Sequence, residues 1–214
     1  METIYMGQEK SCIRGAIRKI SILLIEGKVG VLPTSTIYGL SCRYDNADAV
    51  RKIYMIKERK AGMPFIVLIS SISQLGLLAD KINAVAEKLI GKYWNTEGPE
   101  PLTLVLSKSS AAGSLITGGR PTIAIRMAGL RSIRNIIDLA GPIVSTSATI
   151  SGTIAQPRTI DEVPGKIRQK ADFVVEYSSG LGGRESTIVD VTGEAPLLIR
   201  EGALNSEDVL GSLK

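Results

Sequence analysis

Short hydroxyl-bearing and cationic side chains recur along this chain two residues apart. Hydroxyls are spaced this way in Thr34-Ser35-Thr36 and Ser145-Thr146-Ser147, and cations in Lys57-Glu58-Arg59. Side chains two apart on a β-strand point to the same face. Hydroxyls and fixed positive charges on one surface suit a triphosphate. These segments therefore predict a site for a polyphosphate.

Two later segments show the same alternation. In residues 122–127 the even positions are small or cationic and the odd ones are bulky and apolar. In residues 186–191, Ser186 and Asp190 share the face opposite Val189 and Val191. A half-solvated sheet alternates in this way without any site. Four such segments together favour a concave polar cavity in which a few groups converge.

Lys57 and Arg59 cannot face one ligand from inside a helix, because helical residues two apart point to different sides. Gly62 and Pro64 predict that the chain leaves the helix here. An extended Lys-x-Arg could then direct both cations toward one anion. The alternative is a solvated basic helix end that complements the helix dipole.

The chain has no histidine, which excludes Ser/His/Asp and Cys/His catalysis. Cys12 and Cys42 lie outside any C-x-x-C spacing, so we expect reduced core residues and no metal site. Lysine is missing where the G-x-x-x-x-G spacing occurs, and no G-x-G-x-x-G is present. Scattered side chains must therefore hold a phosphate ligand.

Hydrophobic periodicity predicts the elements that position these groups. A helix is expected over 10–26, a buried strand over 30–33, and a helix over 47–58 capped by Asp45-Asn46. Further strands are predicted at 65–70, 102–107, 122–127, 142–147, 173–177, 186–191 and 196–200. Further helices are predicted near 73–79, 82–93, 131–140 and 206–213. Interleaved strands and helices predict an α/β fold with a twisted mixed sheet and flanking helices.

The 214 residues contain 44% apolar side chains and no linker, which predicts a single domain over 1–214. Apolar runs are too short to span a bilayer and no signal peptide opens the chain, so we expect a cytoplasmic protein with no membrane partner. A net charge of +5 gives only a mild attraction to polyanions.

Seven motifs follow one another between about residues 10 and 205. They are Pro33-Thr34-Ser35-Thr36-Ile37-Tyr38-Gly39-Leu40, Lys57-x-Arg59, Pro101-Leu102-Thr103, Ile123-Ala124-Ile125-Arg126-Met127, Ser145-Thr146-Ser147-Ala148 with Ser151-Gly152, Glu185-Ser186-Thr187-Ile188-Val189-Asp190 and Leu198-Ile199-Arg200-Glu201-Gly202. In this order they resemble the YrdC/TsaC-type L-threonylcarbamoyladenylate synthases, in their short, single-domain form.

That resemblance implies a YrdC-like twisted α/β fold with a positively charged concave site. It implies a nucleotidyltransferase that condenses L-threonine, bicarbonate and ATP, with Mg²⁺, into threonylcarbamoyl-AMP and pyrophosphate. This reaction serves the tRNA threonylcarbamoyladenosine modification. The implied partners are tRNA or double-stranded RNA and the downstream threonylcarbamoyl transferase proteins.

The resemblance also assigns residues by motif position. Contacts to threonine are implied for Thr36, Arg126, Ser186 and, as a weaker candidate, Ser145. Contacts to the nucleotide and its phosphates are implied for Lys57, Arg59, Thr122, Ser147 and Arg200. Catalytic roles fall to Lys57, Arg59 and Ser147, and none of these residues is assigned to a metal.

The sequence departs from the family pattern in three places. Thr149 stands where the family's Ser-x-Asn has its amide, Met63 replaces a polar residue, and Leu68 replaces a histidine of some relatives. One alternative is a non-catalytic or divergent RNA-binding YrdC-like protein that uses its basic surface. Another is carbamoyl transfer in hydrogenase maturation, although the cysteine-rich and acyl-phosphatase-like regions of those proteins are not in this sequence.

Overall fold

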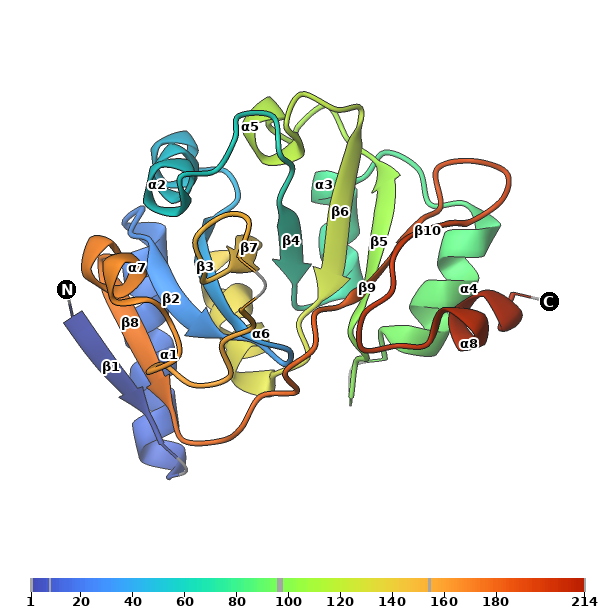
Figure 1. Ribbon diagram of the computed structural model, residues 1–214. Coiled ribbons are helices and arrows are strands. Elements are labelled where there is room, and N and C mark those ends of the chain that lie inside the picture. Colours follow the sequence, from blue (N-terminus) through green and yellow to red (C-terminus); the bar gives the residue numbers. More distant parts are fainter. Residues whose placement is uncertain (1, 8, 96–97, 154, 214) are drawn as a thin grey trace.

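Ten strands form one continuous sheet in the computed structural model, which describes residues 2–7, 9–95, 98–153 and 155–213 (Figure 1). They are β1 (Glu2–Met6), β2 (Gly30–Pro33), β3 (Tyr38–Arg43), β4 (Ile66–Ile69), β5 (Leu102–Ser107), β6 (Thr122–Met127), β7 (Ile143–Ser147), β8 (Phe173–Tyr177), β9 (Thr187–Asp190) and β10 (Leu197–Arg200). Their order across the sheet is β1-β8-β2-β3-β7-β4-β6-β5-β9-β10. Four pairs are parallel (β1 with β8, β2 with β8, β4 with β6, β5 with β9) and the others are antiparallel, so the sheet is mixed, as predicted.

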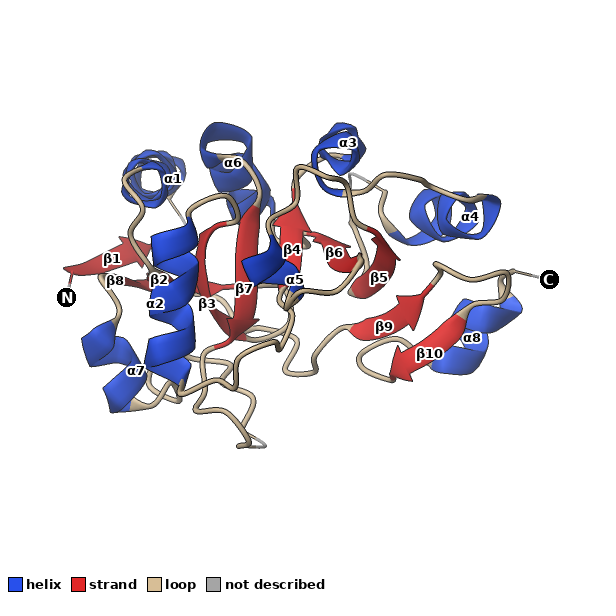
Figure 2. Ribbon diagram, turned by 90° about the horizontal axis from the view of Figure 1, so that it is seen from above, coloured by secondary structure: helices blue, strands red, loops and turns tan. Residues whose placement is uncertain are grey.

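Helices cover this sheet. They are α1 (Lys10–Ile25), α2 (Ala47–Lys57), α3 (Leu75–Leu78), α4 (Ala84–Tyr93), α5 (Ser114–Thr117), α6 (Arg131–Ala140), α7 (Gly165–Lys170) and α8 (Ser206–Gly211), with a 3₁₀ turn over Ile72–Gln74. Figure 2 shows α1, α6, α3 and α4 along one side of the sheet. Within the described ranges, every helix is too short or too polar to span a bilayer.

Two clusters of buried apolar side chains hold the layers together. One joins α1 and α6 to the sheet through residues such as Ile20, Ile136 and Leu32. The larger one joins α2 and α4 to the sheet through residues such as Ile53 and Val31. The strand β2 contributes to both because neighbouring side chains of a strand point to opposite faces.

The predicted helices and strands are present, with ends shifted by a few residues. Asn46 caps α2 as expected, since its side chain accepts a hydrogen bond from the Ala49 amide at 2.9 Å. The predicted helix near 73–79 is a 3₁₀ turn followed by the single helical turn α3. The sequence analysis did not predict β1, β3, α5 or α7. In β3, five of the six residues are buried, so the alternation that marks a half-exposed strand is missing.

Both cysteines are free thiols; Cys42 is a core residue, as expected, whereas Cys12 is only partly buried and lies outside the core clusters. Burial raises the pKa of the Cys42 thiol far above its ordinary value, which makes it unreactive.

Candidate functional site

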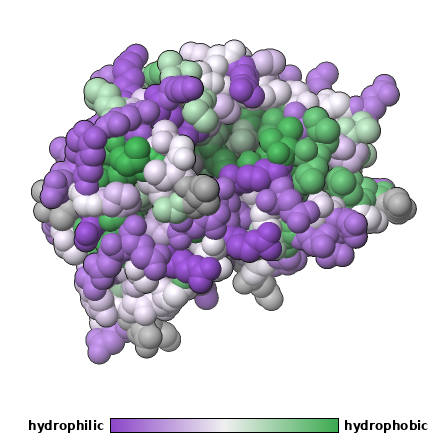
Figure 3. All heavy atoms as spheres, in the orientation of Figure 1, coloured by the Kyte–Doolittle hydropathy of each residue, from purple (hydrophilic) through white to green (hydrophobic). Residues whose placement is uncertain are grey.

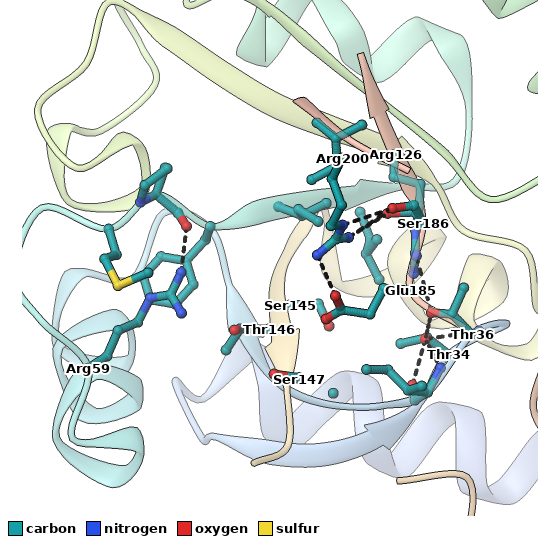
Figure 4. Close-up of a pocket in the computed structure, with 18 residues that line it drawn as sticks. Thr34, Thr36, Arg59, Arg126, Ser145, Thr146, Ser147, Glu185, Ser186 and Arg200 are labelled. Carbon is teal, nitrogen blue, oxygen red and sulfur yellow. Dashed lines mark hydrogen bonds and ion pairs between the residues drawn. The ribbon is translucent and has the colours of Figure 1, made fainter. Parts of the chain in front are cut away.

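A cavity of about 290 Å³ opens where β3, β4, β6, β7 and the β9–β10 hairpin meet (Figure 4). Its polar and charged lining consists of Thr34, Thr36, Arg59, Arg126, Ser145, Thr146, Ser147, Glu185, Ser186 and Arg200. Apolar side chains, among them Ile66, Leu68 and Ile188, complete the wall. The space-filling view shows the hollow near the middle of the molecule, bordered by apolar surface on one side (Figure 3).

Most of the residues singled out in the sequence meet at this cavity. Seven of them line it, namely Thr36, Arg59, Arg126, Ser145, Ser147, Ser186 and Arg200. They come from segments that lie far apart in the chain. Neither Lys57 nor Thr122 is among the described residues that line it.

Arg126 is the most deeply buried cation of the cavity, with 5% of its surface exposed. Its Nη1 donates to the hydroxyl of Thr36 at 3.2 Å, and Thr36 in turn shares a 3.0 Å hydrogen bond with the hydroxyl of Thr34. Within the described chain its Nε has no partner. Burial, and then the charge of Arg200, lower the pKa of Arg126 to about 10. The guanidinium therefore keeps donors available for an anion.

The β9–β10 hairpin contributes a second cation. Arg200 donates from Nη1 to Glu185 Oε2 at 2.6 Å, and from Nε and Nη2 to the Ser186 carbonyl at 3.1 and 2.9 Å. An irregularity between Leu198 and Arg200 shifts the strand register so that Arg200 pairs with Ile188, another cavity residue. The Ser186 hydroxyl is held by Thr103 at 2.7 Å.

Arg59 reaches the cavity because α2 stops two residues before it. Glu58 adopts a left-handed conformation with φ 53°, which turns the chain out of the helix. The Arg59 Nη2 donates to the Pro64 carbonyl at 2.8 Å, and its guanidinium lies 5.0 Å from the Phe65 ring centroid. The predicted exit from the helix is confirmed.

In this structure the Lys57 ammonium is held away from the cavity, whereas Arg59 lines it. The Lys57 side chain is 1% exposed and its ammonium donates to the Ser147 carbonyl, to the Thr149 carbonyl at 2.7 Å and to the Ser147 hydroxyl at 3.4 Å. An ammonium has three donors, so these acceptors occupy it fully. Lys57 therefore lies behind the cavity and holds the end of β7. Burial, and then the charge of Arg59, lower its pKa to about 8.

Thr122 also lies away from the cavity, at the start of β6 and paired with Ser107 of β5. It shares the face of Arg126, as the alternation predicted. Arg126 lies four residue steps further along the strand, a distance of roughly 13 Å. Thr122 therefore lies outside the cavity although it is on the same face of β6 as Arg126.

The sequence analysis assigned no individual contact to Thr34, Thr103 or Glu185. Each belongs to a motif that was recognised, which was the available signal. Thr103 of β5 bonds to Ser186, Glu185 accepts from Arg200 at the end of β10, and Thr34 bonds within a tight turn. Only the folded arrangement reveals these hydrogen bonds.

The chain is therefore an α/β protein with a twisted mixed sheet and a cavity lined by arginines and hydroxyls. The chain belongs to the Sua5/YciO/YrdC family, whose model, described as telomere recombination, matches residues 23–202.

Several proteins are similar to this chain over most of its length. The threonylcarbamoyl-AMP synthase of Pyrococcus abyssi is 37% identical over 194 residues, which are 90% of this chain and 56% of that protein. The protein of the same name from Bacillus subtilis is 34% identical over 195 residues, 90% of this chain and 55% of that protein. The crystal structure of P. abyssi Sua5 complexed with L-threonine matches with a TM-score of 0.90 and 34% identity, and covers 99% of this chain and 62% of that one. The chain thus spans about half the length of these curated relatives.

Proposed function

We propose that this chain synthesises threonylcarbamoyl-AMP from L-threonine, bicarbonate and ATP. The observation that carries the proposal is the convergence of three guanidiniums and several hydroxyls, contributed by separate motifs, on one cavity. The names of the relatives support a synthase over the non-catalytic RNA-binding alternative. We further propose that residues 1–214 form one YrdC-like domain.

The proposed roles follow the positions of the residues in the cavity. Arg126, with Thr36, Ser145 and Ser186 around it, takes the threonine. Arg59, Ser147 and Arg200 take the nucleotide and its phosphates. Lys57 acts through Ser147 as a positioning residue, and Thr122 meets only a part of the nucleotide that extends along β6 beyond the cavity.

The chemistry requires no histidine. The threonine amine forms a C–N bond with bicarbonate and water leaves, which gives a carbamate. A carbamate oxygen then attacks the α-phosphorus of ATP as the bond to pyrophosphate breaks. Alignment of the reactants and neutralisation of the phosphate charge are the protein's main contributions. We propose that Mg²⁺ arrives with ATP.

The product is a mixed anhydride whose threonylcarbamoyl group is activated for transfer. We therefore propose that a threonylcarbamoyl transferase takes it up for modification of tRNA, and that the chain works in the cytoplasm, where tRNA is used. Direct binding of tRNA or double-stranded RNA by this chain is a separate prediction.

The test is pyrophosphate release by the purified chain with each of L-threonine, bicarbonate and Mg²⁺-ATP omitted in turn. We expect release only when all three are present. Arg59→Ala should abolish release, whereas Arg51→Ala should leave it unchanged, because Arg51 is exposed on α2 and pairs only with Asp48. Release that continues without threonine would overturn the amino-acid assignment.

A further inference from the structure

Glu185 is the only carboxylate among the described residues that line the cavity. The same cavity is lined by three guanidiniums, those of Arg59, Arg126 and Arg200, of which Arg200 contacts Glu185 directly. A ligand that carries only negative charge would gain nothing from this carboxylate. Its presence in an otherwise cationic cavity therefore points to a positive group on the ligand.

Only one of the two oxygens of the Glu185 carboxylate accepts a hydrogen bond from a described residue. Its Oε2 accepts from Arg200 at 2.6 Å, and no described residue donates a hydrogen bond to its Oε1. The side chain is 32% exposed, and Figure 4 shows it reaching into the cavity beneath Arg200 and on the side of Ser145. A carboxylate oxygen accepts two hydrogen bonds, so Oε1 can receive a ligand.

Its charge also acts across the cavity. Burial lowers the pKa of Arg126, of Arg200 and of Lys57, and in each case the negative charge of Glu185 opposes that shift. Glu185 is thus close enough to sense cations from β6, β10 and α2. A ligand ammonium in the cavity would feel the same attraction.

We infer that Glu185 receives the α-ammonium of an amino acid whose carboxylate is bound by Arg126. The proposal deepens the proposed function and rests on it. Arg126 is buried with an unpartnered Nε, which suits a fixed carboxylate, and Glu185 offers a free oxygen. The two opposite charges of a zwitterion thereby meet two opposite charges of the cavity. Without Glu185, the ammonium would enter beside three cations with no counter-charge.

The test separates the ammonium from the rest of the ligand. Binding of L-threonine is compared by calorimetry with binding of its 2-hydroxy analogue, in which a hydroxyl replaces the ammonium. The protein is used unaltered and as Glu185→Gln, whose amide oxygen can still accept from Arg200. Because a hydrogen bond to a charged group is lost, we expect the preference for threonine to fall by about tenfold to a hundredfold in the variant.

The control is Glu201→Gln, which makes the same charge change next to Arg200 but outside the cavity, where the carboxylate binds Ser206. This variant should keep the preference. If Glu185→Gln weakens both ligands equally, Glu185 acts only through Arg200 and the inference is overturned. If Glu185→Gln does not fold, the test uses the unaltered protein alone. Equal binding of L-threonine and its 2-hydroxy analogue by that protein also overturns the inference. Failure of the unaltered protein to bind threonine at all would instead remove the proposed function.

Discussion

The ammonium of Lys57 donates a hydrogen bond to the carbonyl oxygen of Thr149 at 2.7 Å, across 92 residues of sequence. The same ammonium donates to the carbonyl and the hydroxyl of Ser147. One buried cation at the end of α2 therefore ties down the segment that presents the Ser147 hydroxyl to the cavity. The cost of burying that charge gives the first prediction.

Stability should depend on pH through Lys57. Its pKa is about 8 in the folded protein against an ordinary value of 10.5, so between these values the unfolded chain holds a proton that the folded chain has lost. The free energy of unfolding therefore rises with pH in this window and is flat for this group below and above it. Relative to Lys57→Met, the unaltered protein should gain about 3 kcal/mol between pH 8 and 10.5. Urea unfolding of both proteins across that window measures the difference, and parallel pH curves would contradict it.

Arg126 should cost stability in the protein without ligand. Its guanidinium is buried and makes one hydrogen bond, to Thr36. Replacing a poorly paired buried charge by an apolar side chain of similar length is often stabilising, by about 1–4 kcal/mol. Arg126→Met should therefore melt at a higher temperature and lose threonine binding. Thermal unfolding and calorimetry together check this, and a lower melting temperature would show that Arg126 is better satisfied than its contacts indicate.

Thr149 should influence the reaction through Ser147. It is 2% exposed, and its hydroxyl lies 3.0 Å from the Ser147 hydroxyl. Thr149→Val keeps the shape and removes that hydrogen bond, worth about 1 kcal/mol, so pyrophosphate release should fall about fivefold. Thr153→Val is the control, because Thr153 is exposed and its hydroxyl bonds only to the Ile150 carbonyl.

Thr149→Asn, which introduces the family's amide, completes the series. Unchanged ATP affinity and product formation in this variant would mean that threonine fully replaces the amide here. A gain would mean that the departure at residue 149 weakens the enzyme.

Gly202 should be needed to hold Glu185 and Ser186 in place. A Cβ at this residue would lie 2.3 Å from the Glu185 carbonyl oxygen and 2.4 Å from the Ser186 carbonyl carbon, both of which are backbone atoms. Gly202→Ala should therefore destabilise the fold by about 1–3 kcal/mol and weaken threonine binding. Gly211→Ala is the matched control, since no atom lies within 4 Å of its added Cβ and it sits in α8. Equal melting temperatures for the two variants would count against this prediction.

Local patterns in the sequence were enough to predict much of the fold and of the site. The apolar stripe along α1, the Asn46 N-cap of α2 and the alternation of polar and apolar side chains in β6 are properties of a few neighbouring residues. The structure has all three. The face of a strand follows from its period of two, and Arg126 and Ser145, which this period assigned to polar faces, both line the cavity. The family resemblance supplied the further information that the seven motifs contribute to one site.

The failures concern interactions between distant segments. The target of the Lys57 ammonium depends on the position of a strand that appears 90 residues later. The distance of Thr122 from the cavity depends on how deep the hollow extends along β6. The pairing of Glu185 with Arg200 depends on the shift in register within the β9–β10 hairpin. None of these follows from the pattern of a single segment.

The strands that carry the cavity are completed out of chain order, since β3 pairs with β7 and β5 pairs with β9. While the chain emerges from the ribosome, Arg126 is present long before Glu185 and Arg200 arrive. A nascent chain shorter than about 200 residues would therefore lack some of the charged side chains of the cavity. It could not bind both the carboxylate and the ammonium of its ligand. Cutting the finished chain anywhere between β3 and β10 would likewise leave neither fragment with a working site.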